Sequence, residues 1–299
     1  MSGGLTEALG AAWRKNVPEV AGLWNGALPA FVTARRPAER LAGVPVFCYH
    51  LVEPDEFGAD LAFLRRNGYA TLSSGAFVDV LTGRAALPER AVLLTFDDGP
   101  RNFHDVAFPL LREFGARATC FVAPGLHAED EAHLEARPMT WAEVRAIAAA
   151  GLVDFQSHTL ESRYVPQWPQ PAALSGCAPA LEARRRRLPL ALAEDLLASR
   201  HELERRLPGS RVTQLAFPMY VGTRNAVAVA RALGFEACYW GLTPGRALNR
   251  PGDDTGHVVR LGDEYLRRLP GEGRRSVPGL FAQRVHRARA GRDWRRRHP

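Results

Sequence analysis

The sequence predicts an α/β protein in which helices cover a parallel sheet. Short apolar runs of strand type alternate with stretches of helical spacing over most of the 299 residues. This alternation is typical of strand–helix–strand units, which close into a barrel or form a doubly wound sheet. Apolar residues make up 46% of the chain and charged residues 24%, as in ordinary globular proteins, so disorder is a poor interpretation.

Elements in the first half of the chain are indicated by their spacing and by the glycines that follow the helices. The predicted strands are 44–49, 91–96 and 118–122. The predicted helices are 57–67 and 103–114, and each is followed by a glycine at the position where a helix commonly ends.

A helix over 140–150 is the best-marked element of the second half, because Thr140 and Glu143 have the spacing of a capping box. The further helices expected are 194–207 and 226–233, and the further strands are 153–157, 215–217, 237–240 and 258–261. A proline-rich stretch over about 164–189 is expected to be an irregular insert.

The regular pattern occupies 41–270 and is expected to form one domain. It is flanked by an extension over 1–40, with a short amphipathic helix, and by a basic tail over 271–299. The net charge is +7, and arginines crowd the end of the tail. Such a tail either contacts an anionic membrane or is a solvated end. We expect no nucleic-acid partner, because the arginine bias of the chain reflects its composition.

The chain is expected to be cytoplasmic, with membrane association through the tail. The first 22 residues lack the unbroken apolar stretch of a secretory signal, since Arg14 and Lys15 fall inside it. No apolar run reaches the ~20 residues that a membrane-spanning helix needs. The four cysteines form no CxxC pair, and Cys48, Cys120 and Cys238 lie in apolar runs, as small core residues do.

Two adjacent acids, Asp97 and Asp98, stand where the strand 91–96 ends, in the run TFDDGP. The carboxyl ends of strands are where barrel enzymes place their sites, and Gly99 and Pro100 supply a bend that brings both acids to one pocket. One acid would ligate a metal while the other takes a proton from the attacking water. Taken alone, the same residues fit a solvated turn.

A histidine, His158, follows the strand 153–157 in the run SHT. A neutral imidazole beside carboxylates is a common metal ligand. Alone, this residue is more typical of a structural histidine. If the strands are parallel, however, its side chain lies at the same end of the sheet as the two acids.

Several segments in this order resemble the polysaccharide deacetylase family, also called the NodB-homology or carbohydrate esterase 4 family. The matching segments are 95–100, 118–122, 139–141, 157–159 and 215–218. The strand 46–50 is similar to the first strand of the branch that contains the poly-N-acetylglucosamine deacetylases. The resemblance covers about 44–262 and implies a distorted (β/α)7-type barrel, NodB-like, with a single catalytic domain.

The resemblance implies a divalent metal, with zinc expected and cobalt, nickel or manganese as alternatives. Asp98 and His158 are the implied ligands. The family's second motif usually carries another histidine four residues after the first, and here that position is Ser162, a poor ligand. Glu161, Ser162 or a residue of the insert would complete the usual set of three protein ligands.

The resemblance also assigns roles in proton transfer and substrate binding. Asp97 is implied as general base, and His50 as the general acid that protonates the leaving amine. The alternative for His50 is a buried histidine bonded to a backbone carbonyl. Phe217, Pro218 and Tyr220 are expected to contact the substrate, although this third motif departs from the family's usual aromatic residue and glycine.

The leading hypothesis is therefore a metal-dependent hydrolase that removes an N-acetyl or related acyl group from an amino sugar of a glycan or glycan precursor. One alternative is a catalytically degenerate barrel that binds a glycan without cleaving it, motivated by Ser162. Another is an amidase that acts on a different acyl group, motivated by the altered third motif, because pocket shape sets acyl selectivity.

Overall fold

The computed structural model describes residues 28–127, 138–163, 165, 179–246, 248–276 and 279–280. Three of the expectations above lie outside these residues: the amphipathic helix before residue 28, most of the insert, and the basic tail after residue 280. Within the described residues, no helix has both the length and the apolar character needed to cross a membrane.

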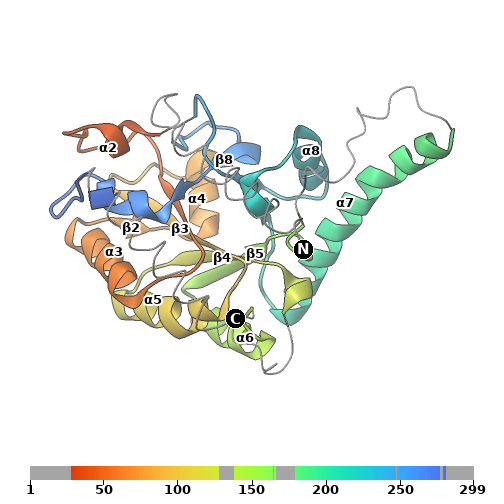
Figure 1. The fold of residues 1–299 in the computed structure, drawn as a ribbon, viewed down its shortest axis with the longest axis horizontal. Coiled ribbons are helices and arrows are strands. Elements are labelled where there is room, and N and C mark those ends of the chain that lie inside the picture. The colour runs from red at the N-terminus through yellow and green to blue at the C-terminus, as the bar shows by residue number, and fades with distance from the viewer. Residues whose placement is uncertain are drawn as a thin grey trace, which may run out of the picture.

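The strands of the described chain form one parallel sheet, and helices lie around it (Figure 1). The strands are β1 (Val46–Tyr49), β2 (Ala70–Thr71), β3 (Ala91–Asp97), β4 (Ala118–Val122), β5 (Val153–Ser157), β6 (Gln214–Ala216), β7 (Ala237–Trp240), β8 (Val258–Val259) and β9 (Leu261–Gly262). Their order is β8-β7-β6-β5-β4-β3-β1-β9, with β2 paired to β3.

The sheet is nearly closed into a barrel by a single short segment. β8 pairs with β7 at one end of the strand order, while β9 pairs with β1 at the other end. Only Arg260 separates β8 from β9, so the two ends of the order are neighbours in the sequence. This arrangement confirms the barrel and rules out the doubly wound sheet. The single strand expected over 258–261 is divided in two at this arginine.

Alternation along the strands creates two apolar layers, as the two-residue period of a strand requires. Leu93, Phe121 and Tyr239 belong to one buried cluster, which fills the inside of the barrel. Leu94 and Phe96 belong to the other cluster, which packs the outside of the strands against the helices. Both faces of the sheet are therefore covered, which is why the strands are continuously apolar.

The helices are α2 (Ala30–Thr33), α3 (Pro54–Arg66), α4 (Ser74–Leu81), α5 (Phe108–Phe114), α6 (Trp141–Ala149), α7 (Pro179–Arg206) and α8 (Arg224–Ala232). A π-helical turn over Phe103–Ala107 leads into α5. The predicted capping box is confirmed, since the Thr140 side chain accepts from the Glu143 backbone and the Glu143 carboxylate accepts from the Thr140 backbone.

One helix missing from the sequence analysis, α4, closes the barrel at the end where the strands begin. Its Phe77 packs with Tyr239 inside the barrel, with ring centroids 6.0 Å apart. At its start, the backbone and hydroxyl of Ser74 donate to Asp154 at 2.7 and 2.9 Å, near the beginning of β5. The opposite end of the barrel, where the strands finish, is left for the polar residues.

One other expectation about the elements needs correction. Helix α7 begins at Pro179 rather than at residue 194, so the last part of the supposed irregular insert is helical. The leucine, arginine and alanine content of 180–188 favours a helix and outweighs the effect of Pro189. In addition, Phe31 and Val32 of the expected extension are buried in the outer apolar cluster, so this segment packs on the barrel.

Candidate active site

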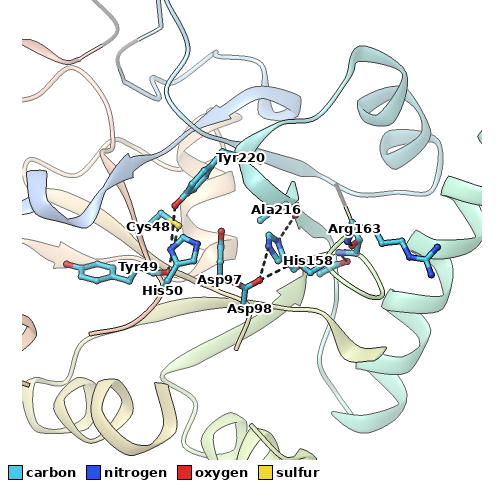
Figure 2. A network of polar contacts seen from close by, with 12 residues as sticks. Cys48, Tyr49, His50, Asp97, Asp98, His158, Arg163, Ala216 and Tyr220 are labelled. Carbon is cyan, nitrogen blue, oxygen red and sulfur yellow. Dashed lines mark hydrogen bonds and ion pairs between the residues drawn. The ribbon is translucent and has the colours of Figure 1, made fainter. Parts of the chain in front are cut away.

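Five polar side chains meet at the carboxyl ends of four strands (Figure 2). Asp97 is the last residue of β3 and Asp98 follows it; His50 follows β1, His158 follows β5, and Tyr220 lies beyond β6. Parallel strands place their carboxyl ends at one face of a barrel, which is where barrel enzymes carry out catalysis. The sequence patterns thus predicted that four of these residues lie close together. The fifth, Tyr220, was expected as a substrate contact.

Asp97 is buried and bound by an arginine that the sequence analysis did not single out. Arg260 Nη1 donates to Asp97 Oδ1 at 2.6 Å and Nη2 donates to Oδ2 at 2.9 Å. Burial alone would raise the pKa of the Asp97 carboxyl, but Arg260 and, to a smaller extent, His158 and His50 hold that pKa well below its usual range. Asp97 is therefore ionised at neutral pH.

The neighbouring acid, Asp98, has a different environment. Its side chain is 51% exposed, and its backbone is left-handed with φ of 67°. Gly99 is also left-handed, and a Cβ there would lie 2.6 Å from Val122 Cγ1, so the turn requires glycine. This turn rotates Asp98 away from the buried pocket of Asp97. The two adjacent acids are thereby separated into a buried, arginine-bound carboxylate and an accessible one.

His158 presents one ring nitrogen to Asp98. Its Nδ1 lies 2.8 Å from the carbonyl oxygen of Ala216, so Nδ1 carries the hydrogen and donates it. In the neutral ring the other nitrogen, Nε2, carries the lone pair, and it lies 3.5 Å from Asp98 Oδ1. Fixing the tautomer of a ligand histidine through its second nitrogen is the usual arrangement at metal sites.

The residues suggested for a third ligand lie in different positions. Ser162 Oγ donates to Asp98 Oδ1 at 3.3 Å, so its hydroxyl lies beside the expected metal position. The carboxylate of Glu161 is instead paired with Arg163, at 2.5 Å from Nη2 and 3.0 Å from Nε. Within the described ranges, no group of three or more histidine, cysteine, aspartate or glutamate side chains is placed to hold a metal.

These residues nevertheless fit a divalent cation with two strong protein donors. Asp98 offers an exposed carboxylate oxygen, and His158 offers an oriented lone pair close to it. Ser162 adds a neutral hydroxyl, which is a weaker donor than an imidazole. Water and substrate oxygens would have to supply the remaining positions.

Helix α7 supports the loop that carries His158. Asp195 Oδ1 accepts from the backbone nitrogen of Leu160 at 3.0 Å. The buried Ser199 hydroxyl lies 2.7 Å from Ser157 Oγ and donates to the Thr159 carbonyl at 3.2 Å. The position of His158 therefore depends on a helix that begins more than twenty residues later in the chain.

The third motif reaches the site through only one of its three predicted substrate contacts. Phe217 is fully buried, with its ring against Trp240 at a centroid distance of 5.0 Å, and Pro218 is buried as well. This burial does not favour direct substrate contact by Phe217 and Pro218, which stays a prediction. Tyr220 is half-buried, and its hydroxyl lies 3.5 Å from Nδ1 of His50.

The model of the polysaccharide deacetylase family matches residues 84–238, which is more than half of the chain. The chain belongs to the polysaccharide deacetylase family. The resemblance inferred from the motifs is thereby confirmed.

A poly-beta-1,6-N-acetyl-D-glucosamine N-deacetylase of Escherichia coli (strain K12) is 34% identical to this chain over 113 residues. The match covers 34% of this chain and 17% of the E. coli protein, so it spans a small part of that relative.

Solved structures with the same fold cover most of the chain. IcaB from Ammonifex degensii has a TM-score of 0.61 and 27% identity, covering 76% of this chain and 95% of that one. The BpsB deacetylase domain from Bordetella bronchiseptica has a TM-score of 0.58 and 24% identity, covering 76% and 98%. The second likeness concerns the fold alone.

Proposed function

We propose that this polysaccharide deacetylase is a metal-dependent N-deacetylase that releases acetate from an N-acetylated amino sugar of a glycan or glycan precursor. The observation that carries the proposal is the separation of roles between two adjacent acids. Asp97 is buried against Arg260, while Asp98 is exposed and faces Nε2 of His158. The E. coli relative, by its name, acts on such a sugar.

Asp97 is proposed as the general base. Arg260 keeps its carboxylate ionised, so that it accepts a proton from water as the water oxygen attacks the acetyl carbon. The same arginine lowers the basicity of Asp97, which limits the driving force for the transfer. Its bidentate contact also fixes the carboxylate plane, so the accepting oxygen is held in one orientation.

Asp98 and His158 are the residues that would hold the divalent ion, with zinc expected and cobalt, nickel or manganese as alternatives. When bound, such an ion polarises a carbonyl and lowers the pKa of water. Ser162 contributes by donating to Asp98 Oδ1, which orients the carboxylate.

His50 is proposed as the general acid. It stands one residue beyond the Tyr49–Phe96 pair of β1 and β3, and therefore beside Asp97 in the register of the two strands. Its protonated imidazole would transfer a proton to the sugar nitrogen as the C–N bond breaks. The products are acetate and a free amino sugar.

The test uses the full chain, purified and dialysed against zinc or cobalt, with N-acetylglucosamine oligomers as substrate and released acetate as readout. Asp97→Asn is expected to lower the rate at least 100-fold. Glu113→Gln, at an exposed position of α5, serves as the matched control and should retain full activity. Equal rates for the wild type and Asp97→Asn would contradict the proposal.

A second candidate function is glycan binding without cleavage, favoured by the hydroxyl of Ser162 in place of a stronger third donor. It predicts that the wild type binds the oligomers but releases no acetate with any of the four metals. It also predicts that Asp98→Ala keeps the same affinity for the sugar, because no metal would contribute to binding.

A further inference from the structure

Tyr220 contacts both the proposed acid and the group that orients the proposed base. Its hydroxyl lies 3.5 Å from Nδ1 of His50, and the two rings meet edge to face at a centroid distance of 5.8 Å. On its other side, the Arg260 guanidinium lies over the Tyr220 ring, with Cζ 5.1 Å from the centroid. Arg260 also holds Asp97, so the Tyr220 ring contacts both the proposed acid, His50, and the arginine that orients the proposed base.

The backbone at Tyr220 has an unusual conformation, which directs its side chain toward His50. Met219 and Tyr220 both have left-handed φ values, 56° and 65°, which are uncommon for residues other than glycine. The Tyr220 carbonyl accepts from the Gly241 nitrogen at 3.1 Å, and a Cβ on Gly241 would lie 2.8 Å from Tyr220 Cβ. Consecutive strained residues persist where the surroundings determine them, and they concentrate at functional sites.

The hydroxyl of Tyr220 has a further neighbour besides His50. Figure 2 shows the thiol of Cys48, on β1, beside the same hydroxyl. Burial raises the pKa of Tyr220 well above its ordinary value, so the phenol keeps its hydrogen throughout. A hydroxyl donates one hydrogen bond and accepts two. With its hydrogen turned to the sulfur, the oxygen accepts from Nδ1–H of protonated His50.

We infer that Tyr220 is a positioning residue that holds His50 by Nδ1 and thereby directs Nε2–H toward the nitrogen of the leaving amine. This inference rests on the proposed deacetylase function. In the step concerned, the Nε2–H bond breaks and an N–H bond forms on the sugar nitrogen as its bond to the acetyl carbon breaks. His50 becomes neutral and keeps its hydrogen on Nδ1, still bonded to Tyr220.

The experiment compares two acetyl substrates in Tyr220→Phe. An N-acetylglucosamine oligomer needs protonation of its nitrogen, whereas 4-nitrophenyl acetate has a leaving group that departs without a proton. We expect kcat for the oligomer to fall about 10-fold to 100-fold with little change in KM, because orienting contacts to a reacting group are typically of this size. The rate with the ester should stay within about twofold.

Two controls separate this role from a structural one. The Phe variant keeps the ring over Arg260 and loses only the oxygen, and its Tm confirms folding. Tyr69→Phe removes another buried hydroxyl, which lies away from the site and donates to the Pro270 carbonyl at 2.9 Å. This variant should leave the ratio of the two rates unchanged. His50→Gln should show the same selective loss, and adding Tyr220→Phe to it should cause no further loss.

Equal losses on both substrates, or no loss on either, would overturn the positioning role, because a general disturbance does not distinguish leaving groups. Additive losses in the double variant would overturn it as well, since they would show that Tyr220 acts independently of His50. If the wild type releases no acetate from the oligomer, the proposed function itself fails, and that result is seen before any variant is compared.

Discussion

Arg260 and Asp97 form a fully buried, bidentate ion pair across 163 positions of the sequence. The pair joins the seam of the barrel, between β8 and β9, to the end of β3. It therefore has two consequences, since closure of the barrel places the cation and the cation orients the proposed base. A buried pair of this kind is costly to break, because the remaining partner becomes an uncompensated buried charge.

Replacement of the arginine by methionine is expected to destabilise the protein by about 3–5 kcal/mol, the usual range for removing one partner of a buried pair. Urea unfolding of Arg260→Met and the wild type measures the difference. Arg40→Met removes a solvent-exposed partner of Glu89 and should have little effect. Arg260→Lys should still lose most of the activity, because an ammonium cannot make the bidentate contact. Equal stabilities for Arg260→Met and Arg40→Met would show that the pair adds nothing.

The stability of the protein should depend on the protonation of Asp97 in acid. The pKa of this carboxyl is lowered in the folded state, so between about pH 4 and its folded value the unfolded chain binds more protons. Stability is thus present above the unfolded pKa and is lost as the pH falls toward the folded one. The slope from this group is at most about 1.4 kcal/mol per pH unit.

Asp97→Asn removes that contribution. Its free energy of unfolding should be lower than that of the wild type at neutral pH but should change less steeply between about pH 4 and pH 2. Denaturant unfolding at several pH values provides both curves. Parallel curves for the two proteins would contradict the assignment of a lowered pKa to Asp97.

Metal affinity should respond to the residue at position 162. Ser162→His offers an imidazole beside Asp98, where the present hydroxyl lies 3.3 Å from Oδ1, and should tighten zinc or cobalt binding at least tenfold. Ser162→Ala removes the hydroxyl and is the matched control, with an expected change of less than about threefold. Calorimetric titration of the chelator-treated protein measures both. A histidine variant that binds no tighter than the alanine variant would place the ion elsewhere.

The contact between α7 and the His158 loop should matter for both stability and metal binding. Ser199→Ala removes a buried hydroxyl that bonds to Ser157 and Thr159, and is expected to cost about 1–2 kcal/mol. Metal affinity should fall several-fold, because His158 adjoins this contact. Leu197→Ala, on an exposed position of the same helix, should change neither quantity. A loss of stability with unchanged metal affinity would show that the Ser199 contacts stabilise the fold without positioning His158.

By itself, the sequence determined the strand–helix alternation and the strand ends at which the candidate site residues lie. Each of Asp97, Asp98, His158 and His50 lies at or just after the carboxyl end of an apolar strand, and parallel strands bring such residues to one face without any knowledge of long-range contacts. The capping box at Thr140 was equally predictable, because both of its hydrogen bonds lie within one turn of helix.

Only the tertiary structure decided which groups orient the proposed catalytic residues. Arg260 stands in the apolar run VVRL, and an arginine inside such a run indicates a buried charge. Its partner, however, lies 163 positions away in the sequence. Tyr220 points at His50 because two left-handed residues turn the chain there, and neither Met219 nor Tyr220 indicates that conformation by its type. Local patterns specify elements and their ends, whereas contacts between distant segments exist only once the barrel has closed.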